Sequence, residues 1–109
     1  MFGKEIIEYS PFQDEDKGTF GIKGTGENGE EVGHIVLTLN GETARSLSVL
    51  VSPGYWNKGI GTTLLQEAEA LALARGATEI FVPEVANEKA AEFLKKRGYS
   101  VGETAYKRL

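Results

Sequence analysis

The 109-residue sequence has no cysteine and only one histidine, His34. Without thiols, the chain cannot form a disulfide framework, a thiolate zinc site or a cysteine nucleophile. One histidine cannot supply the clusters on which histidine-based metal sites depend, so we expect no metal. The chemistry must therefore come from backbone groups, hydroxyls, carboxylates and amines.

Long apolar runs and an excess of positive charge are also missing. The apolar stretches are far shorter than the ~20 residues of a membrane helix, and Met-Phe-Gly-Lys-Glu at the start is unlike a signal peptide. Twelve basic and 16 acidic residues give a net charge of -4, which argues against a nucleic-acid partner. We expect a soluble cytoplasmic protein with neither a nucleic-acid nor a membrane partner.

What is present is typical of one globular domain over residues 1–109. The hydrophobic fraction is 40% and the charged fraction 26%, close to ordinary usage for folded proteins. We find no internal repeat, low-complexity tract or linker. A chain of this size can bury a core without cross-links.

The first half has the alternating pattern of strands separated by turns. Asn28-Gly29 and Asn40-Gly41 are typical of tight hairpin turns, and Pro11 with its acidic neighbours favours a loop over 10–18. The predicted strands are Lys4 to Tyr9, Thr19 to Thr25, Glu31 to Asn40 and Ala44 to Ser52.

The second half changes to helical spacing. Apolar residues recur on one face over 59–75, and Asn87 is a suitable N-cap for a second helix over 88–97. Strands are predicted over 79–86 and 101–109. The whole is α/β (α+β): a mixed, mostly antiparallel sheet of about six strands flanked by two main helices.

The most informative stretch joins the fourth predicted strand to the first helix. Gly59 and Gly61 allow a tight turn and a close approach of the backbone to a ligand. A helix start presents free N–H groups and positive potential, which suits phosphate, and Lys58 and Thr62 could add contacts. A plain strand-to-helix turn would use the same glycines, so both interpretations stand on this motif alone. It matches neither a P-loop nor a dinucleotide fingerprint.

The order of motifs resembles the GNAT superfamily of acetyl-CoA-dependent N-acetyltransferases over about 44–99. The loop resembles the family pattern Arg/Gln-x-x-Gly-x-Gly, with Trp56 where the family has Arg or Gln. Asn87, Ala90 and Phe93, followed by Gly98-Tyr99, resemble the family's later signature.

This resemblance implies that the loop amides grip the pyrophosphate of coenzyme A and that pantetheine lies along the preceding strand. Asn87 would touch the pantetheine arm, and Ala90, Phe93 and Leu94 would wall the acetyl end. A backbone N–H of the strand would polarise the thioester carbonyl. The implied cofactor-binding residues are Leu47, Val49, Leu50, Val51, Trp56, Asn57, Lys58, Gly59, Ile60, Gly61, Thr62, Asn87, Ala90 and Phe93.

The acid and the base are less clearly indicated. Leu94 stands where the family often has a Tyr that protonates the leaving thiolate, and water is an alternative donor. Glu84 is the candidate base and Tyr99 the candidate acid, although a solvated carboxylate and a core tyrosine would read the same way. His34 and Tyr106 remain alternatives.

The family usually carries one or two helices after the first strand, and 11–18 is too short for them. The acceptor side would then be open, to be completed by a macromolecular amine or by a second copy in a homodimer. The main hypothesis is transfer of an acetyl group from acetyl-CoA to a primary amine, of a small molecule or a protein, by direct attack. The alternatives are a coenzyme A-binding module with weak or no catalysis, and a partner-binding domain without a cofactor.

Overall fold

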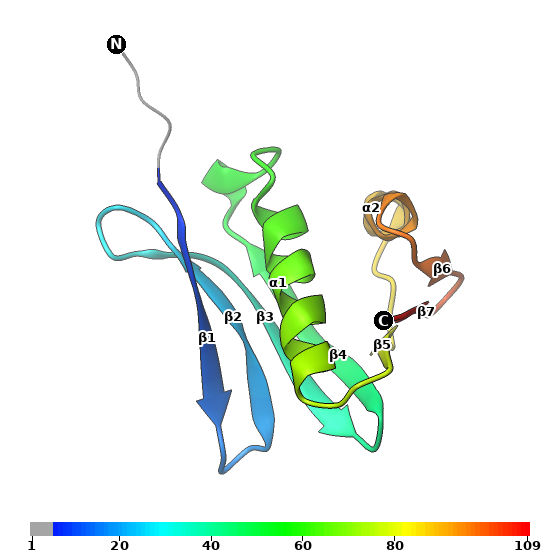
Figure 1. Cartoon of the computed structure of the whole chain (residues 1–109). Coiled ribbons are helices and arrows are strands. Elements are labelled where there is room, and N and C mark those ends of the chain that lie inside the picture. Colours follow the sequence, from blue (N-terminus) through cyan, green and yellow to red (C-terminus); the bar gives the residue numbers. More distant parts are fainter. Residues whose placement is uncertain (1–5) are drawn as a thin grey trace.

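The computed structural model describes residues 6–109, which form a seven-stranded sheet and two α-helices (Figure 1). The strand order in the sheet is β1-β2-β3-β4-β5-β7-β6. The elements are β1 (Glu8–Asp14), β2 (Thr19–Thr25), β3 (Glu31–Asn40), β4 (Thr43–Val51), the 3-10 turn η1 (Pro53–Tyr55), α1 (Ile60–Ala74), β5 (Glu79–Val82), α2 (Glu88–Lys96), β6 (Ser100–Val101) and β7 (Ala105–Arg108).

The predicted fold class is confirmed. Strands β1 to β4 form an antiparallel meander, and α1 then carries the chain over to β5, which lies parallel to β4. All other pairings are antiparallel. The sheet has seven strands because the segment predicted as one strand over 101–109 folds back on itself as the β6–β7 hairpin.

The prediction for the first strand was wrong in its position. Lys4 and Glu5 lie outside the described residues, and the strand runs from Glu8 to Asp14, through half of the predicted loop. Pro11 is tolerated there because β1 is an edge strand that pairs only with β2, and an edge strand does not need every N–H for pairing. Likewise, the strand predicted over 79–86 ends at Val82, immediately before Pro83.

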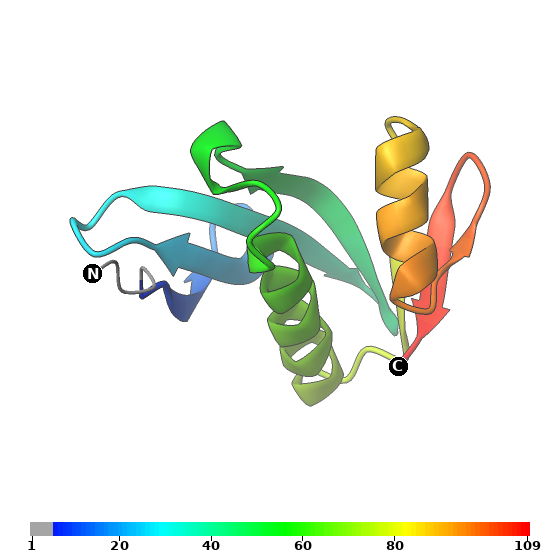
Figure 2. The same cartoon turned by 90° about the horizontal axis from the view of Figure 1, so that it is seen from above.

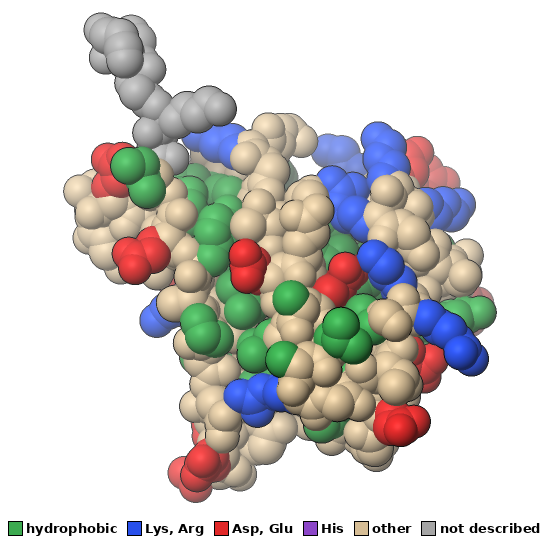
Figure 3. All heavy atoms as spheres, viewed as in Figure 1, with side chains coloured by type: hydrophobic (Ala, Val, Ile, Leu, Met, Phe, Trp, Pro, Cys, Tyr) green, Lys and Arg blue, Asp and Glu red, His purple; other side chains and the backbone are tan. Residues whose placement is uncertain are grey.

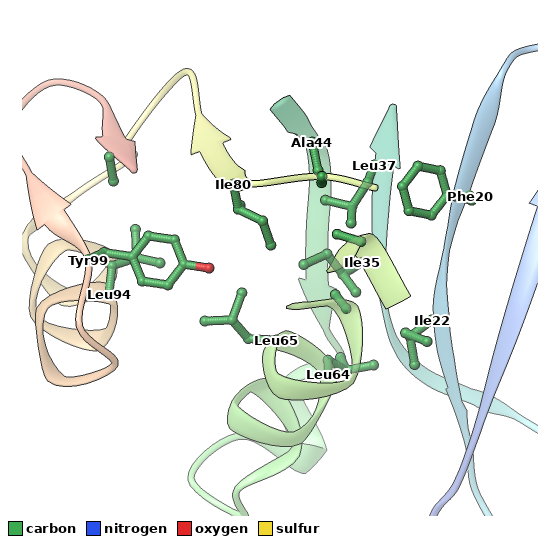
Figure 4. Close-up of a cluster of buried hydrophobic side chains, with 14 of the residues drawn as sticks. Phe20, Ile22, Ile35, Leu37, Ala44, Leu64, Leu65, Ile80, Leu94 and Tyr99 are labelled. Atoms are coloured by element: carbon green, nitrogen blue, oxygen red, sulfur yellow. The ribbon is translucent and has the colours of Figure 1, made fainter. Parts of the chain in front are cut away.

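The core lies between the sheet and α1 (Figure 4). Ile35 and Leu37 from β3 and Leu64 from α1 are almost completely buried. Leu94 of α2 and Tyr99 belong to the same buried cluster and face Leu65 of α1. Both helices therefore pack on one face of the sheet. No helix among the described residues is long and apolar enough to cross a membrane.

Candidate functional site

The site begins where β4 and β5 separate. These strands pair only from Thr43 to Arg45, opposite Glu79 to Phe81. Beyond this point β4 continues to Val51, paired with β3 alone, and curves away from β5 (Figure 2). Leu47, Val49 and Leu50, three of the predicted cofactor-binding residues, lie on this free part, and each is about half exposed. A strand with one open edge offers backbone N–H and C=O groups to a ligand.

A β-bulge sits at the start of this free segment. Val36 pairs with Ser48 and Leu37 with Ser46, so Leu47 is an extra residue in β4. A bulge bends the strand and increases its twist. The bulge at Leu47 therefore accounts for the bend by which β4 turns away from β5.

The loop after β4 is fixed by side chains at both ends. The Trp56 indole Nε1 donates to the Val51 carbonyl at 2.6 Å, and the Tyr55 hydroxyl donates to Glu30 at 2.9 Å. Glu30's own backbone N–H and the Tyr55 hydroxyl together lower the pKa of the Glu30 carboxyl. Asn57 (φ 62°) and Gly59 (φ 80°) adopt left-handed conformations, which turn the chain into α1.

The loop places the N-terminus of α1 beside the free end of β4, where β4 and β5 have separated. Thr63 donates to the Gly59 carbonyl at 3.1 Å, so the amides of Ile60, Gly61 and Thr62 precede the hydrogen-bonded ladder of the helix. Gly59 provides no side-chain cap. Such a helix start can bind an anion, and the binding of phosphate by this turn stays a prediction.

Three elements converge at Gly61. A Cβ on this glycine would lie 3.5 Å from the Phe93 ring of α2 and 3.8 Å from Val51 of β4. The structure thus brings together Val51, the first turn of α1 and Phe93, which the sequence had placed around one cofactor.

Arg97 also lies at this convergence, although the run Lys95-Lys96-Arg97 is typical of a solvated helix end and Arg97 was not among the predicted cofactor-binding residues. Its Nε donates to the Thr62 hydroxyl at 3.0 Å, and its guanidinium stacks on Phe93 at 3.9 Å from the ring centroid. Nη1 also donates to the Phe93 carbonyl. A cation at the end of a helix is usually a dipole partner, so only the tertiary contact with Thr62 distinguishes Arg97 from Lys95 and Lys96. Positive side chains gather on the side of the molecule that α2 occupies (Figure 3).

The Asn87 side chain stabilises the start of α2. Its side chain caps α2 by accepting from the Ala90 amide at 2.9 Å. Ala90 and Phe93 are half-buried, whereas Leu94 is 8% exposed and points into the core. The Leu94 side chain therefore packs with the core where the family often carries its tyrosine.

The two candidate catalytic residues lie apart from this convergence. Glu84 follows β5 in an exposed loop, rather than on the strand where we expected it. Tyr99 is buried, and its hydroxyl donates to Glu69 at 2.9 Å, while Lys107 contacts the same carboxylate at 3.1 Å. Burial, and then the hydrogen bond and charge of Glu69, raises the pKa of Tyr99.

Comparison with known proteins agrees with the fold. A family model described as the acetyltransferase (GNAT) family matches residues 2–99, so the chain belongs to the GNAT family of acetyltransferases. Comparison with curated protein sequences finds no significant match.

Solved structures share the fold at low sequence identity. A Staphylococcus aureus GNAT acetyltransferase has a TM-score of 0.74 at 17% identity, over 86% of this chain and 70% of that one. A Klebsiella pneumoniae protein described as an acyl-CoA N-acyltransferase gives 0.76 at 19%, over 86% and 74%. The PaiA N-acetyltransferase of Thermoplasma acidophilum, in complex with coenzyme A, gives 0.68 at 26%, over 84% and 60%.

Proposed function

We propose that this protein transfers an acetyl group from acetyl-CoA to a primary amine. The observation that carries the proposal is the convergence, at Gly61, of the free end of β4, the first turn of α1 and the Phe93–Arg97 end of α2. Free helix amides and a fixed guanidinium suit a pyrophosphate. The open edge of β4 suits an extended amide-bearing arm, which can pair with it as a strand does.

We assign a separate role in binding the donor to each part of the site. The amides of Ile60, Gly61 and Thr62, with Arg97, hold the phosphates. The edge of β4 from Leu47 to Val51 aligns the arm and supplies a backbone N–H to the thioester oxygen. The enzyme then needs only to bring an amine against the thioester and remove its proton.

The proposal of an amine acceptor is supported by a hollow on the face of the sheet opposite α1. The hollow has a volume of about 800 Å³ and is lined by Phe12, Val36 and Leu47 and by the β1–β2 turn, whose three carboxylates, Asp14 to Asp16, outnumber its one cation, Lys17. An ammonium group is attracted by such a lining. The hollow reaches Leu47, the bulge residue at which β4 leaves β5.

The test is a melting curve with and without acetyl-CoA. Ligand at ~100 times its dissociation constant adds about 2.7 kcal/mol, and each kcal/mol raises Tm by about 4–8 °C in a domain of this size. An unchanged Tm at millimolar acetyl-CoA would refute the proposal. Free coenzyme A, which offers the same phosphates, is the matched ligand.

A donor-binding module without turnover is the second candidate, favoured by the apolar Leu94. It predicts the same rise in Tm but no release of coenzyme A when amines are added. Thiol release on adding a primary amine would exclude it.

A further inference from the structure

Three polar side chains form a connected chain on the sheet face opposite α1. His34 Nδ1 lies 3.1 Å from Glu31 Oε2, and His34 Nε2 lies 3.2 Å from Ser48 Oγ. The His34 side chain is 23% exposed and that of Glu31 is 47% exposed. Ser48 is exposed as well, so all three are open to a ligand on this face.

The hydrogen-bond roles follow from the carboxylate. Glu31 can only accept, so neutral His34 carries its proton on Nδ1 and donates it to Glu31. Nε2 then has a free lone pair, and the Ser48 hydroxyl donates to it. Ser48 is left able to take a proton from a third group while it passes its own to the imidazole.

Two irregularities in the sheet place these groups. The register shifts between Gly24 and Thr25, opposite 31–33, which puts Glu31 on the face of His34 although the two are three residues apart. The bulge at Leu47 sets the position of Ser48. Bulges are frequent beside active sites because they re-aim side chains in this way.

The chain ends at the proposed reaction centre. Ser48 lies in the free part of β4, next to Leu47 and opposite Val36, and both of these residues line the acidic hollow. The donor would approach β4 from the face of α1 and α2, and the acceptor from the opposite face. Ser48 is on the acceptor's face.

We propose that Ser48, His34 and Glu31 form the proton relay that deprotonates the acceptor amine, an inference that rests on the proposed function. The ammonium ion gives a proton to Ser48 Oγ as Ser48 gives its proton to His34 Nε2. The neutral amine attacks the thioester carbon, so an N–C bond forms and the C–S bond breaks. The second nitrogen proton ends on the thiolate, and the imidazolium returns its proton to water. Glu31 is a positioning residue that holds the imidazole and stabilises its cation.

Two charged side chains face His34: Glu31 from β3 and Lys23 from β2. Ser48 and Leu50, which face it from β4, are uncharged.

The experiment compares two probe amines at saturating acetyl-CoA. An n-alkylamine is an ammonium ion at neutral pH, as lysine is with a pKa near 10.4, and it needs the relay. Methoxyamine is uncharged at neutral pH and does not. We expect His34→Gln and Ser48→Ala to lower kcat/KM for the alkylamine by about 10²-fold, to change methoxyamine turnover only a few-fold and to leave acetyl-CoA affinity unchanged. Lys23→Gln, on the same face but outside the relay, is the matched control and should keep the wild-type ratio.

The outcomes distinguish failure of the relay from failure of the proposed function. Equal losses on the two amines would overturn the relay alone. Donor binding without turnover on either amine would overturn it and leave the cofactor site standing. A wild-type protein that does not bind acetyl-CoA would refute the proposed function, and the relay with it.

Discussion

Arg97, which directly follows α2, donates from Nε to the hydroxyl of Thr62 in the first turn of α1 at 3.0 Å. The guanidinium stacks on the Phe93 ring and also donates a hydrogen bond to the Phe93 carbonyl. This contact joins the two helices across the mouth of the proposed slot, and it fixes a permanent positive charge beside amides that have no partner in the helix. An anion bound there would meet donors from both helices.

Replacing Arg97 with Ala should weaken coenzyme A binding. A hydrogen bond to a charged group contributes about 1.5–3 kcal/mol, which corresponds to a loss of affinity of roughly 10–100-fold. Titration calorimetry with coenzyme A measures this loss. Lys96→Ala removes a neighbouring, exposed charge and is the control. Equal affinities for the two variants would mean that Arg97 serves only to join the helices.

Gly61→Asp should abolish coenzyme A binding while the fold survives. A Cβ fits at position 61, since its nearest neighbour would be 3.5 Å away, and an acidic side chain in the first turn suits the helix dipole. The carboxylate would repel the pyrophosphate. Gly61→Ala adds the Cβ without the charge and should bind more tightly than the Asp variant. Undiminished affinity in Gly61→Asp, by the same titration, would remove the loop from the binding site.

Tyr99→Phe should reduce stability and leave kcat unchanged. The hydroxyl is buried and bonded to Glu69, which keeps Lys107 as a partner, so we expect a loss of about 1–2 kcal/mol in the free energy of unfolding. Denaturant unfolding measures the stability, with the exposed Tyr106→Phe as control. A fall in kcat without a change in acetyl-CoA affinity would restore Tyr99 as the acid.

The same tyrosine predicts the direction of alkaline unfolding. The pKa of Tyr99 is raised in the folded protein, whereas an unfolded tyrosine ionises near 10. Its contribution to stability is therefore fully present below about pH 10 and is lost as the pH rises further. Tyr99→Phe should lack this part of the decline. Parallel stability curves for the two proteins above that pH would contradict the raised pKa.

Leu94→Tyr should raise kcat at some cost in stability. Leu94 points into the core, so the new side chain would have to turn out toward the proposed slot for its hydroxyl to give a proton to the leaving thiolate. The larger side chain also overpacks the position by about 1–3 kcal/mol. Leu94→Phe has nearly the same bulk without the hydroxyl, so comparing the two isolates the acid. Equal kcat values would mean that water or another group already protonates the thiolate.

Local sequence was enough for most of the elements. The strands from 19 to 40, both helices and the glycine turn before α1 follow from hydrophobic spacing, capping and turn residues, which act over a few positions. The first strand was misplaced because Pro11 and the acidic residues favour a loop locally. Pro11 is tolerated in this strand only because β1 lies at the edge of the sheet.

The sequence by itself determined most of the meander, the two helices and the glycine turn before α1, because each depends on neighbours along the chain. The tertiary structure alone decided that Arg97 meets Thr62, that Tyr99 is held by Glu69, and that Glu31, His34 and Ser48 form one chain. These contacts depend on how α2 packs beside α1 and on two shifts of strand register. A shift of one residue moves a side chain to the other face of the sheet, and no local pattern in the sequence encodes it.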